Sequence, residues 1–347
     1  LINFLASRNV LPRYGFPVDV VELNLKLNHY YKDDDVELQR DLRLAVSEYA
    51  PEGQVVAAGN VWTSRYLQKM PQRLWLRYYY GMCSQCQNHV AKLDVGDSNQ
   101  MATCAVCGAR VKCTDTFVVP EFGFLVDTSE PQKAGSQRPE RTFSSRVFFS
   151  GLGTESEEQT LEMPGGTVMV STSREGKLAV VNEARGAQFR ICQSCGYGVI
   201  GTDKIARTAH INAYGRECRG KFIRAALGHE FRSDIARIRF GPHAPVSEGF
   251  WYSMLYALIE GACLALDIER LEVDGCIQRG DAAGHDTNLI LFDSVPGGAG
   301  HVQRLRSLEA LYSALEAALE KMASCECGDE SASGSCYSCL RNYSNQF

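Results

Sequence analysis

The residues best suited to chemistry in this 347-residue chain are its fourteen cysteines, most of which recur in closely spaced pairs. Pairs of thiolates on tight turns are typical ligands of structural zinc. Disulfide-dense proteins are instead typically small and secreted, and this longer chain has no stretch resembling a signal peptide. The spacing therefore predicts about three structural Zn²⁺ ions in a reducing compartment, and we expect a cytoplasmic protein.

Three groups of candidate ligands follow from the spacing. The first contains two Cys-x2-Cys pairs, separated by a loop long enough to let both pairs meet around one ion. The second combines one such pair with a histidine and a third cysteine, and the last ends the chain with a Cys-x-Cys and a Cys-x2-Cys pair. The predicted ligands are Cys83, Cys86, Cys104 and Cys107; Cys192, Cys195, His210 and Cys218; and Cys325, Cys327, Cys336 and Cys339.

Four ligands in each group predict closed structural sites, because catalytic zinc keeps one position open for water or substrate. We therefore expect no catalytic residue in this chain. A hydrolytic cluster could be imagined from Asp274, Asp293 and His301, but their spacing does not require one. The other cysteines are expected to be buried thiols without metal, with a substitute-ligand role as the alternative for the first of them: Cys113, Cys263 and Cys276.

The bulk composition describes an ordinary globular protein, with 45% hydrophobic and 22% charged residues. We expect no apolar run near the roughly 18–20 residues of a membrane span, and hence no membrane partner. A net charge of −5 and a pI of about 5.9 argue against a generally basic surface. A local basic patch would still be sufficient to bind nucleic acid.

Residues 216–240 form such a stretch, with seven basic residues against three acidic ones. Phosphate contacts from these side chains would supply salt-sensitive affinity that does not depend on base sequence. The alternative is an ordinary solvated charged face. The candidate nucleic-acid contacts are Arg216, Arg219, Lys221, Arg224 and Arg232.

A glycine-rich turn, Pro296–Gly300, separates a predicted strand, Asn288–Asp293, from a predicted helix, Val302–Met322. Backbone N–H groups at such a turn can hold a phosphate of DNA. The alternative is a tight turn that lets the strand and the helix approach closely. The motif is not a Walker A loop, because the chain has no G-x-x-x-x-G-K-[ST].

The expected fold is α+β, a multi-module zinc-binding protein with short β-strands, zinc ribbons and a small helix-covered α/β layer. Apolar residues at helical spacing from Trp251 to Leu266 predict a core helix. An amphipathic helix is expected over Val36–Ala45, capped by Asp33–Asp35, and an extended conformation is expected for Cys325-x-Cys327. Three modules are predicted: 1–80, 81–190 and 191–347.

The runs ILFDSVPGGAGHVQRL, CEC and CYSCLRNYSNQ near the C-terminus resemble the MrfA-type zinc-binding family. This cysteine-rich domain follows DEAD/DEAH-box helicase cores and also occurs in DrmB, a subunit of the DISARM phage-defence system. The resemblance implies that 191–347 is this domain, that 81–190 is a zinc ribbon plus a β-rich module, and that 1–80 links them to an upstream helicase core. Because the chain begins at Leu1 and stops at Phe347 within its last motif, we expect a piece of a longer polypeptide.

The function implied is that of a C-terminal accessory region of an ATP-dependent superfamily-two DNA helicase, with DNA and a helicase core as partners. It would support the motor and engage DNA in repair or phage defence. The first alternative is a standalone, non-ATPase subunit of the DrmB kind that scaffolds a separate helicase. The second is a zinc-dependent nuclease or hydrolase.

Overall fold

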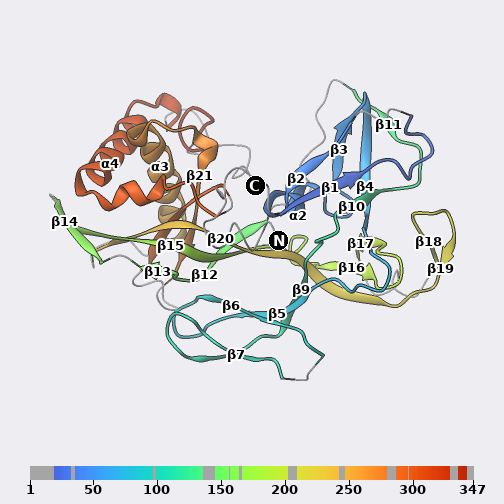
Figure 1. Cartoon of the computed structure of the whole chain (residues 1–347). Helices are drawn as coiled ribbons and strands as arrows, with labels where there is room; N and C mark the ends of the chain where they lie inside the picture. The colour runs from blue at the N-terminus through green and yellow to red at the C-terminus, as the bar shows by residue number, and fades with distance from the viewer. Residues whose placement is uncertain are drawn as a thin grey trace, which may run out of the picture.

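The structure is a computed structural model that describes most of the chain. The described residues are 19–32, 36–96, 99–135, 145–155, 157–163, 166–201, 209–241, 247–279, 287–295, 297–328 and 335–341. They form mixed sheets with few helices, so the predicted α+β class is confirmed. Figure 1 shows the longer helices at one end of two long strands and a separate small sheet toward the other end.

The small sheet is built from the N-terminal third of the chain. Its strands are β1 (Val20–Asn24), β2 (Gln39–Asp41), β3 (Gln54–Ala57), β4 (Asn60–Leu67), β10 (Phe124–Val126) and β11 (Gln132–Lys133). Pairing is antiparallel except between β1 and β10, which run parallel. Tyr49, Trp62 and Phe124 are fully buried and fill its core.

The helix expected over Val36–Ala45 begins later than predicted. Helix α2 covers Leu42–Glu48, and Asp41 caps it by accepting a hydrogen bond from the Arg43 N–H at 2.8 Å. The preceding residues pair with β1 instead, because Asp41 lies opposite Val20 in the antiparallel register. The predicted cap at Asp33–Asp35 lies outside the described residues.

Two long strands, β15 (Gly166–Asn182) and β20 (Phe222–Phe240), form the centre of the large sheet. They pair antiparallel from Val168 opposite Phe240 to Asn182 opposite Leu227. The register shifts between Ser173 and Gly176, where a side chain on Gly176 would collide with Ile235 at 2.7 Å. Only short β-strands were expected from the sequence, and the irregularity at Ser173–Gly176 explains why the pattern of this long strand is interrupted.

The remaining strands extend this sheet or form small hairpins beside it. They are β5 (Arg77–Met82), β6 (His89–Leu93), β7 (Met101–Thr103), β8 (Arg110–Lys112), β9 (Asp115–Val118), β12 (Arg146–Gly151), β13 (Thr154–Glu155), β14 (Gln159–Met163), β16 (Phe189–Cys192), β17 (Gly198–Ile200), β18 (His210–Ile211), β19 (Glu217–Cys218), β21 (Val273–Gln278) and β22 (Asn288–Asp293). Strands β5 and β16 run through the predicted module boundaries after residues 80 and 190. The division into three modules stays a prediction.

A helical layer covers one end of the large sheet. It consists of α3 (Glu248–Leu266), α4 (Leu308–Ala323) and the 3-10 turns η3 (Arg270–Glu272) and η4 (Val302–Arg306). The face of α3 predicted to be buried is buried, with Leu258, Ile259 and Ala262 fully enclosed. The helix expected over Val302–Met322 is divided at Ser307, where the backbone is extended.

Helix α3 contradicts the expectation that no apolar run approaches the length of a membrane span. Its segment Gly249–Leu266 has eighteen residues and a mean hydropathy of 1.3, which is long and apolar enough to cross a membrane by length and composition. Half of that segment is buried inside the protein. The apolar face that gives α3 its high mean hydropathy therefore forms part of the core with α4, β21 and β22.

Candidate metal centres and basic surface

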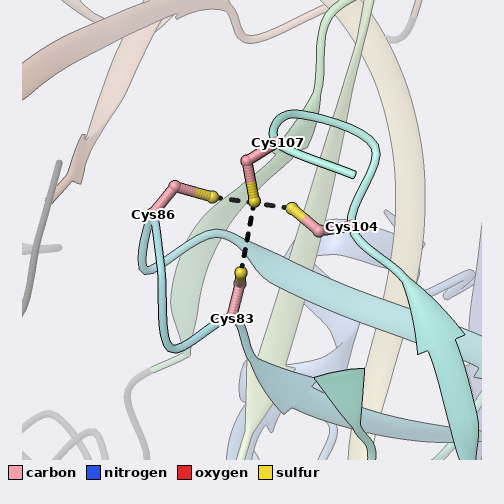
Figure 2. Close-up of side chains that lie close together, drawn as sticks. All are labelled: Cys83, Cys86, Cys104 and Cys107. Carbon is pink, nitrogen blue, oxygen red and sulfur yellow. Dashed lines mark hydrogen bonds between the residues drawn. The ribbon is translucent and has the colours of Figure 1, made fainter. Parts of the chain in front are cut away.

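The first predicted ligand set comes together at the ends of β5–β6 and β7–β8. Figure 2 shows the four thiols of Cys83, Cys86, Cys104 and Cys107 converging on one point. Each pair lies on the same kind of turn: the N–H of Gln87 donates to the Cys83 carbonyl at 2.9 Å, and that of Gly108 to the Cys104 carbonyl at 3.0 Å. Gln87 and Gly108 both have positive φ, the conformation for which glycine is best suited.

The sulfur separations in this first centre match a tetrahedral ion. Cys83 Sγ lies 3.5 Å from Cys107 Sγ, and Cys86 Sγ lies 3.5 Å from Cys104 Sγ. Zinc with Zn–S bonds of about 2.3 Å holds its sulfur ligands roughly 3.8 Å apart. A small shift of side chains would therefore place all four thiolates on one zinc ion.

The second centre lies beside the small sheet, where β16 meets the β18–β19 hairpin. Cys192 Sγ lies 3.8 Å from Cys218 Sγ, and Cys195 Sγ lies 3.2 Å from His210 Nε2. His210 and Cys218 are directly opposite in the β18–β19 register, so this short hairpin supplies two ligands from the same pair of positions. Three sulfurs and one imidazole nitrogen suit zinc's tetrahedral preference.

Close packing holds the second centre in place. The His210 ring contacts Tyr197 and Phe222, with ring centroids 4.8 and 4.9 Å away. A side chain on Gly220 would meet Cys192 Sγ at 2.6 Å, so only glycine lets β19 turn so close to the ligand. The geometry thus leaves room for an ion between the ligands and little room elsewhere.

The third centre is local to the C-terminal end of the chain. Its sulfurs are 3.4 Å apart for Cys325–Cys327, 3.5 Å for Cys325–Cys336 and 3.6 Å for Cys327–Cys339. The expectation of an extended Cys-x-Cys pair was wrong, because Glu326–Gly328 form a 3-10 turn, η5. A tight turn brings neighbouring sulfurs together on one side without a strand partner.

In each centre one cysteine has a lowered pKa, whereas a thiol hydrogen-bonded to it has a raised pKa: Cys86 beside Cys83, Cys195 beside Cys192 and Cys327 beside Cys336. Burial disfavours ionised Cys83, yet N–H groups of Cys86 and Gln85 donate to it and its pKa falls to about 7. Hydrogen bonding from Cys195 lowers the pKa of Cys192 to about 4. The Ser338 N–H donates to Cys336 and lowers that pKa to about 6. Backbone donors at the turns thus favour the charged form that zinc requires.

The structure leaves the other described cysteines outside all three ligand sets, although Cys113 packs against Cys83 and Cys104. Among the described residues, the groups of side chains able to hold a metal are the three predicted sets and include no further cysteine. Burial raises the pKa of Cys113, and it raises that of Cys263 to about 11. Such thiols pack as small apolar side chains. The substitute-ligand alternative for Cys113 has no support in this geometry.

The backbone N–H groups at the glycine-rich turn already bind an anionic group, and this group is a side chain of the same protein. The carboxylate of Asp293, at the end of β22, is fully buried. It accepts hydrogen bonds from the N–H groups of Ala299, Gly300, His301 and Val302, at 2.7, 2.6, 3.1 and 3.0 Å. The position that was a candidate for a DNA phosphate is therefore occupied by Asp293.

The contacts of Asp274, Asp293 and His301 also argue against a hydrolytic cluster of these three residues. Asp274 forms an ion pair with Arg43 at 3.2 Å, and His301 Nε2 lies 3.8 Å from Glu272. Asp293 is buried and fully engaged by backbone donors, so it can neither bind substrate nor activate water. The three side chains have separate structural partners.

The predicted basic stretch divides into two ends along β20. At the far end, Arg232 pairs with Glu175 at 3.4 Å, and Arg239 pairs with Glu158 at 2.9 Å. At the end beside the second metal centre, the exposed side chains of Arg216, Lys221 and Arg224 have no acidic partner within the described part of the chain. Among the residues that the structure describes, this near end therefore carries positive charge that no acidic side chain pairs with at Arg216, Lys221 or Arg224.

Two further cations belong with the near end. Arg219 is exposed and pairs with Glu217 at 2.6 Å, a surface contact that contributes little stability. Lys69, which sequence reasoning missed, donates a hydrogen bond from Nζ to the carbonyl of Gln193, which lies between the candidate metal ligands Cys192 and Cys195. No local motif marks Lys69, because only the tertiary fold brings it to this surface.

Comparisons with known proteins bear on the C-terminal part of the chain. Residues 254–340 match the family model of the MrfA Zn-binding domain. The predicted resemblance is thus confirmed for this stretch, which includes all four cysteines of the third centre. Residues 254–340 are a zinc-binding region related to that of MrfA.

One curated relative aligns with the whole chain. Druantia protein DruE from Escherichia coli (strain UMEA 4076-1) is 24% identical over 399 aligned residues. The alignment covers 100% of this chain and 21% of that protein, so the chain spans about a fifth of the relative's length.

Two solved structures are distantly similar. The structure of the DUF1998 helicase MrfA bound to DNA has 11% identity and a TM-score of 0.36, covering 94% of this chain and 31% of that one. The structure of MrfA bound to DNA and AMPPNP has 10% identity and a TM-score of 0.31, covering 93% and 29%. Both likenesses are too distant to place individual residues.

Proposed function

We propose that this chain is the zinc-stabilised accessory region of an ATP-dependent DEAD/DEAH-box DNA helicase of superfamily two. The MrfA Zn-binding domain over residues 254–340 is the observation that carries the proposal. In this proposal the motor precedes the chain in one cytoplasmic polypeptide, which acts in DNA repair or phage defence. The chain supports the motor and engages DNA.

DNA engagement is assigned to the near end of β20 and its metal centre. Arg216, Lys221 and Arg224 are exposed and have no acidic partner among the described residues, whereas the cations at the far end have acidic partners. Uncompensated cations release counterions from phosphates and so supply affinity for DNA of any sequence. The closed ligand sets give the zinc ions a structural role, with one ion in each of three centres.

Zinc analysis of the purified protein tests the structural part of this proposal. We expect about three zinc ions per chain, retained during dialysis and not exchanged when DNA is added. Fewer than about two ions per chain would contradict it. A metal that exchanges with substrate, together with DNA cleavage without ATP, would favour the nuclease or hydrolase alternative.

DNA-stimulated ATP hydrolysis by the native, untruncated polypeptide tests the helicase assignment. Robust hydrolysis by this polypeptide alone would support a motor in the same chain. Hydrolysis that appears only after a separate helicase is added would favour the DrmB-like scaffold instead. A Lys221→Ala and Arg224→Ala variant should keep basal ATPase activity but need more DNA to stimulate it.

A further inference from the structure

A single aromatic side chain is held out into solvent at the second metal centre. Tyr214 lies in the turn between β18 and β19 and is 73% exposed, whereas its neighbour Ala213 is 6% exposed. Figure 1 shows this hairpin projecting at the edge of the molecule away from α3 and α4. Exposing a tyrosine this fully costs apolar burial, and the sequence of a compact turn does not require it.

The turn that carries Tyr214 is rigid. Asn212 Oδ1 accepts hydrogen bonds from the N–H groups of Tyr214 at 2.9 Å and Arg216 at 3.0 Å. The Asn212 carbonyl accepts a third from Gly215 at 3.0 Å. These bonds fix the backbone at the tip, so little backbone entropy is left to lose when the tyrosine ring binds a partner.

The base of the hairpin is anchored as firmly as its tip. Ala213 packs in a buried cluster with Tyr66 and Leu125, and the Tyr66 hydroxyl donates to the Ile211 carbonyl at 3.1 Å. Below the turn, His210 and Cys218 both belong to the second metal centre. The ligand set of the second centre, core packing and turn bonding therefore act together to hold the backbone of the hairpin that carries the exposed ring.

Exposed basic residues follow Tyr214 closely along the chain. Arg216 follows two residues later in the same turn, and Arg219 and Lys221 continue along the chain from β19 toward β20, all exposed. Glu217 is the one acidic side chain between Arg216 and Lys221, and it is paired with Arg219. An aromatic face beside cations is the combination that binds single-stranded nucleic acid, with bases stacked on the ring and phosphates on the cations.

We propose that Tyr214 is a stacking platform for an unpaired DNA base, with Arg216 holding an adjacent phosphate. The inference deepens the proposed function and rests on it, since it names the form of DNA that this surface binds. Bases within a duplex stack on one another and leave no face for the ring. The hairpin therefore prefers single-stranded over double-stranded DNA.

Binding of oligodeoxynucleotides to the zinc-loaded protein tests this inference. Fluorescence anisotropy should show that Tyr214→Ala weakens binding of a single strand about five- to hundredfold, the range for one stacked base. Tyr214→Phe should retain the affinity, and duplex binding should change less than twofold. Tyr312→Ala, which removes an exposed tyrosine beside Glu316 on α4, is the matched control and should change neither.

Photocrosslinking gives a readout that loss of folding cannot imitate. A single strand carrying 5-iodouracil should crosslink to a peptide containing Tyr214 when irradiated, as located by mass spectrometry. All variants should keep the zinc content of the unmodified protein. If Tyr214→Ala loses zinc, its binding data cannot be interpreted. The crosslink in the unmodified protein then tests the inference by itself.

The outcomes separate the two proposals. If Tyr214→Ala binds single strands normally and no crosslink forms there, while Arg224→Ala weakens all DNA binding, the stacking inference fails and the proposed function stands. If Tyr214→Ala weakens single-strand and duplex binding equally, the ring does not stack specifically on an unpaired base, and the inference also fails. If no variant on this surface affects DNA binding, both proposals fail.

Discussion

The glycine-rich turn after β22 and the near end of β20 both looked able to bind a phosphate, but only one of them has unused capacity. At the turn, four backbone N–H groups already bond to the buried carboxylate of Asp293. At the near end of β20, Arg216, Lys221 and Arg224 are exposed and have no acidic partner among the described residues. The difference shows that donor geometry alone does not identify an anion site, because the chain can supply the anion itself.

The two regions also differ in what holds them together. The turn is stabilised by hydrogen bonds within residues 293–302 and by the helical layer above it. The near end of β20 adjoins a candidate metal centre whose ligands come from β16, β18 and β19 and the turn after β16. Removing metal should therefore unfold the near end of β20 and leave the glycine-rich turn after β22 folded.

The largest expected effect comes from breaking the second metal centre. Cys192→Ser should lower the zinc content by one ion per chain, because it removes a fully buried ligand. A structural zinc contributes on the order of 10 kcal/mol of folding free energy, so the β16–β19 region should unfold and DNA affinity should be lost. Hydrogen exchange should show continued protection of β22 and α3.

Cys113→Ser is the matched control, since Cys113 is equally buried but lies outside the metal-binding groups. It should keep all of the zinc and the DNA affinity. Full DNA affinity in Cys192→Ser after loss of one zinc ion would show that the basic surface does not depend on this centre.

The next effect concerns the turn. Asp293→Ala should lower the free energy of unfolding by about 3–5 kcal/mol, because it leaves the N–H groups of Ala299 to Val302, the last of them buried, without their acceptor. Urea unfolding measures this change. Asp267→Asn is the control: Asp267 is an exposed cap with φ 53°, a conformation that asparagine also adopts readily, so stability should change little.

DNA binding by the folded fraction of Asp293→Ala should equal that of the unmodified protein. If this variant instead remained stable and gained or lost affinity for DNA, the turn would be an anion site after all. The comparison between the turn and the near end of β20 would then no longer hold, because the turn would have unused capacity for an anion.

A smaller effect is expected from the basic surface. Replacing Arg216, Lys221 and Arg224 together by alanine should weaken DNA binding about tenfold or more near 0.15 M salt. The slope of log affinity against log salt should fall by roughly 2–3, because each lost phosphate contact removes about one unit or slightly less. Titrations at several salt concentrations measure both quantities, and stability should be nearly unchanged because the side chains are exposed.

Arg232→Ala separates the two ends of the strand. Arg232 was a predicted DNA contact, and the structure pairs it with Glu175 at 3.4 Å. We expect its loss to affect DNA binding less than the loss of Arg224 does. An equal loss for both variants would extend the binding surface along the length of β20.

Ligand spacing and helical periodicity carried most of what could be predicted from sequence. The structure brings each predicted quartet together, since paired cysteines on turns are close in sequence and need only a loop to meet. The strand Asn288–Asp293 and the buried face of α3 were likewise encoded by local patterns of apolar residues.

What the sequence did not reveal depends on tertiary contacts. The role of Asp293 was missed because its donors lie six to nine residues away, across a turn whose path no motif specifies. The length of β15 was missed because Glu175, with φ 60°, interrupts the alternating pattern without ending the strand. The exposure of Tyr214 follows from the metal-anchored hairpin, and a tyrosine at that position is equally compatible with a core.

The smallest expected effect tests why the turn rejects a further anion. Asp234 lies beside Asp293, and burial followed by the charge of Asp293 raises its pKa. A raised pKa in the folded state means that protonated Asp234 stabilises the protein below the unfolded value of about 4, and that this stability is lost as pH rises through the folded pKa. Asp234→Asn should therefore raise the free energy of unfolding at pH 7, by less than about 1 kcal/mol for a partly exposed group.

The variant should also unfold with a flatter pH profile than the unmodified protein between pH 4 and pH 7, as measured by urea titration at each pH. Asparagine keeps an oxygen able to accept the bond from Gln303 Nε2, which spans 3.3 Å in the native protein. A loss of stability at pH 7 would instead mean that the Asp234 carboxylate is needed as an acceptor. In that case hydrogen bonding, and not repulsion between two carboxylates, would dominate at the turn, and its exclusion of phosphate would rest on Asp293 alone.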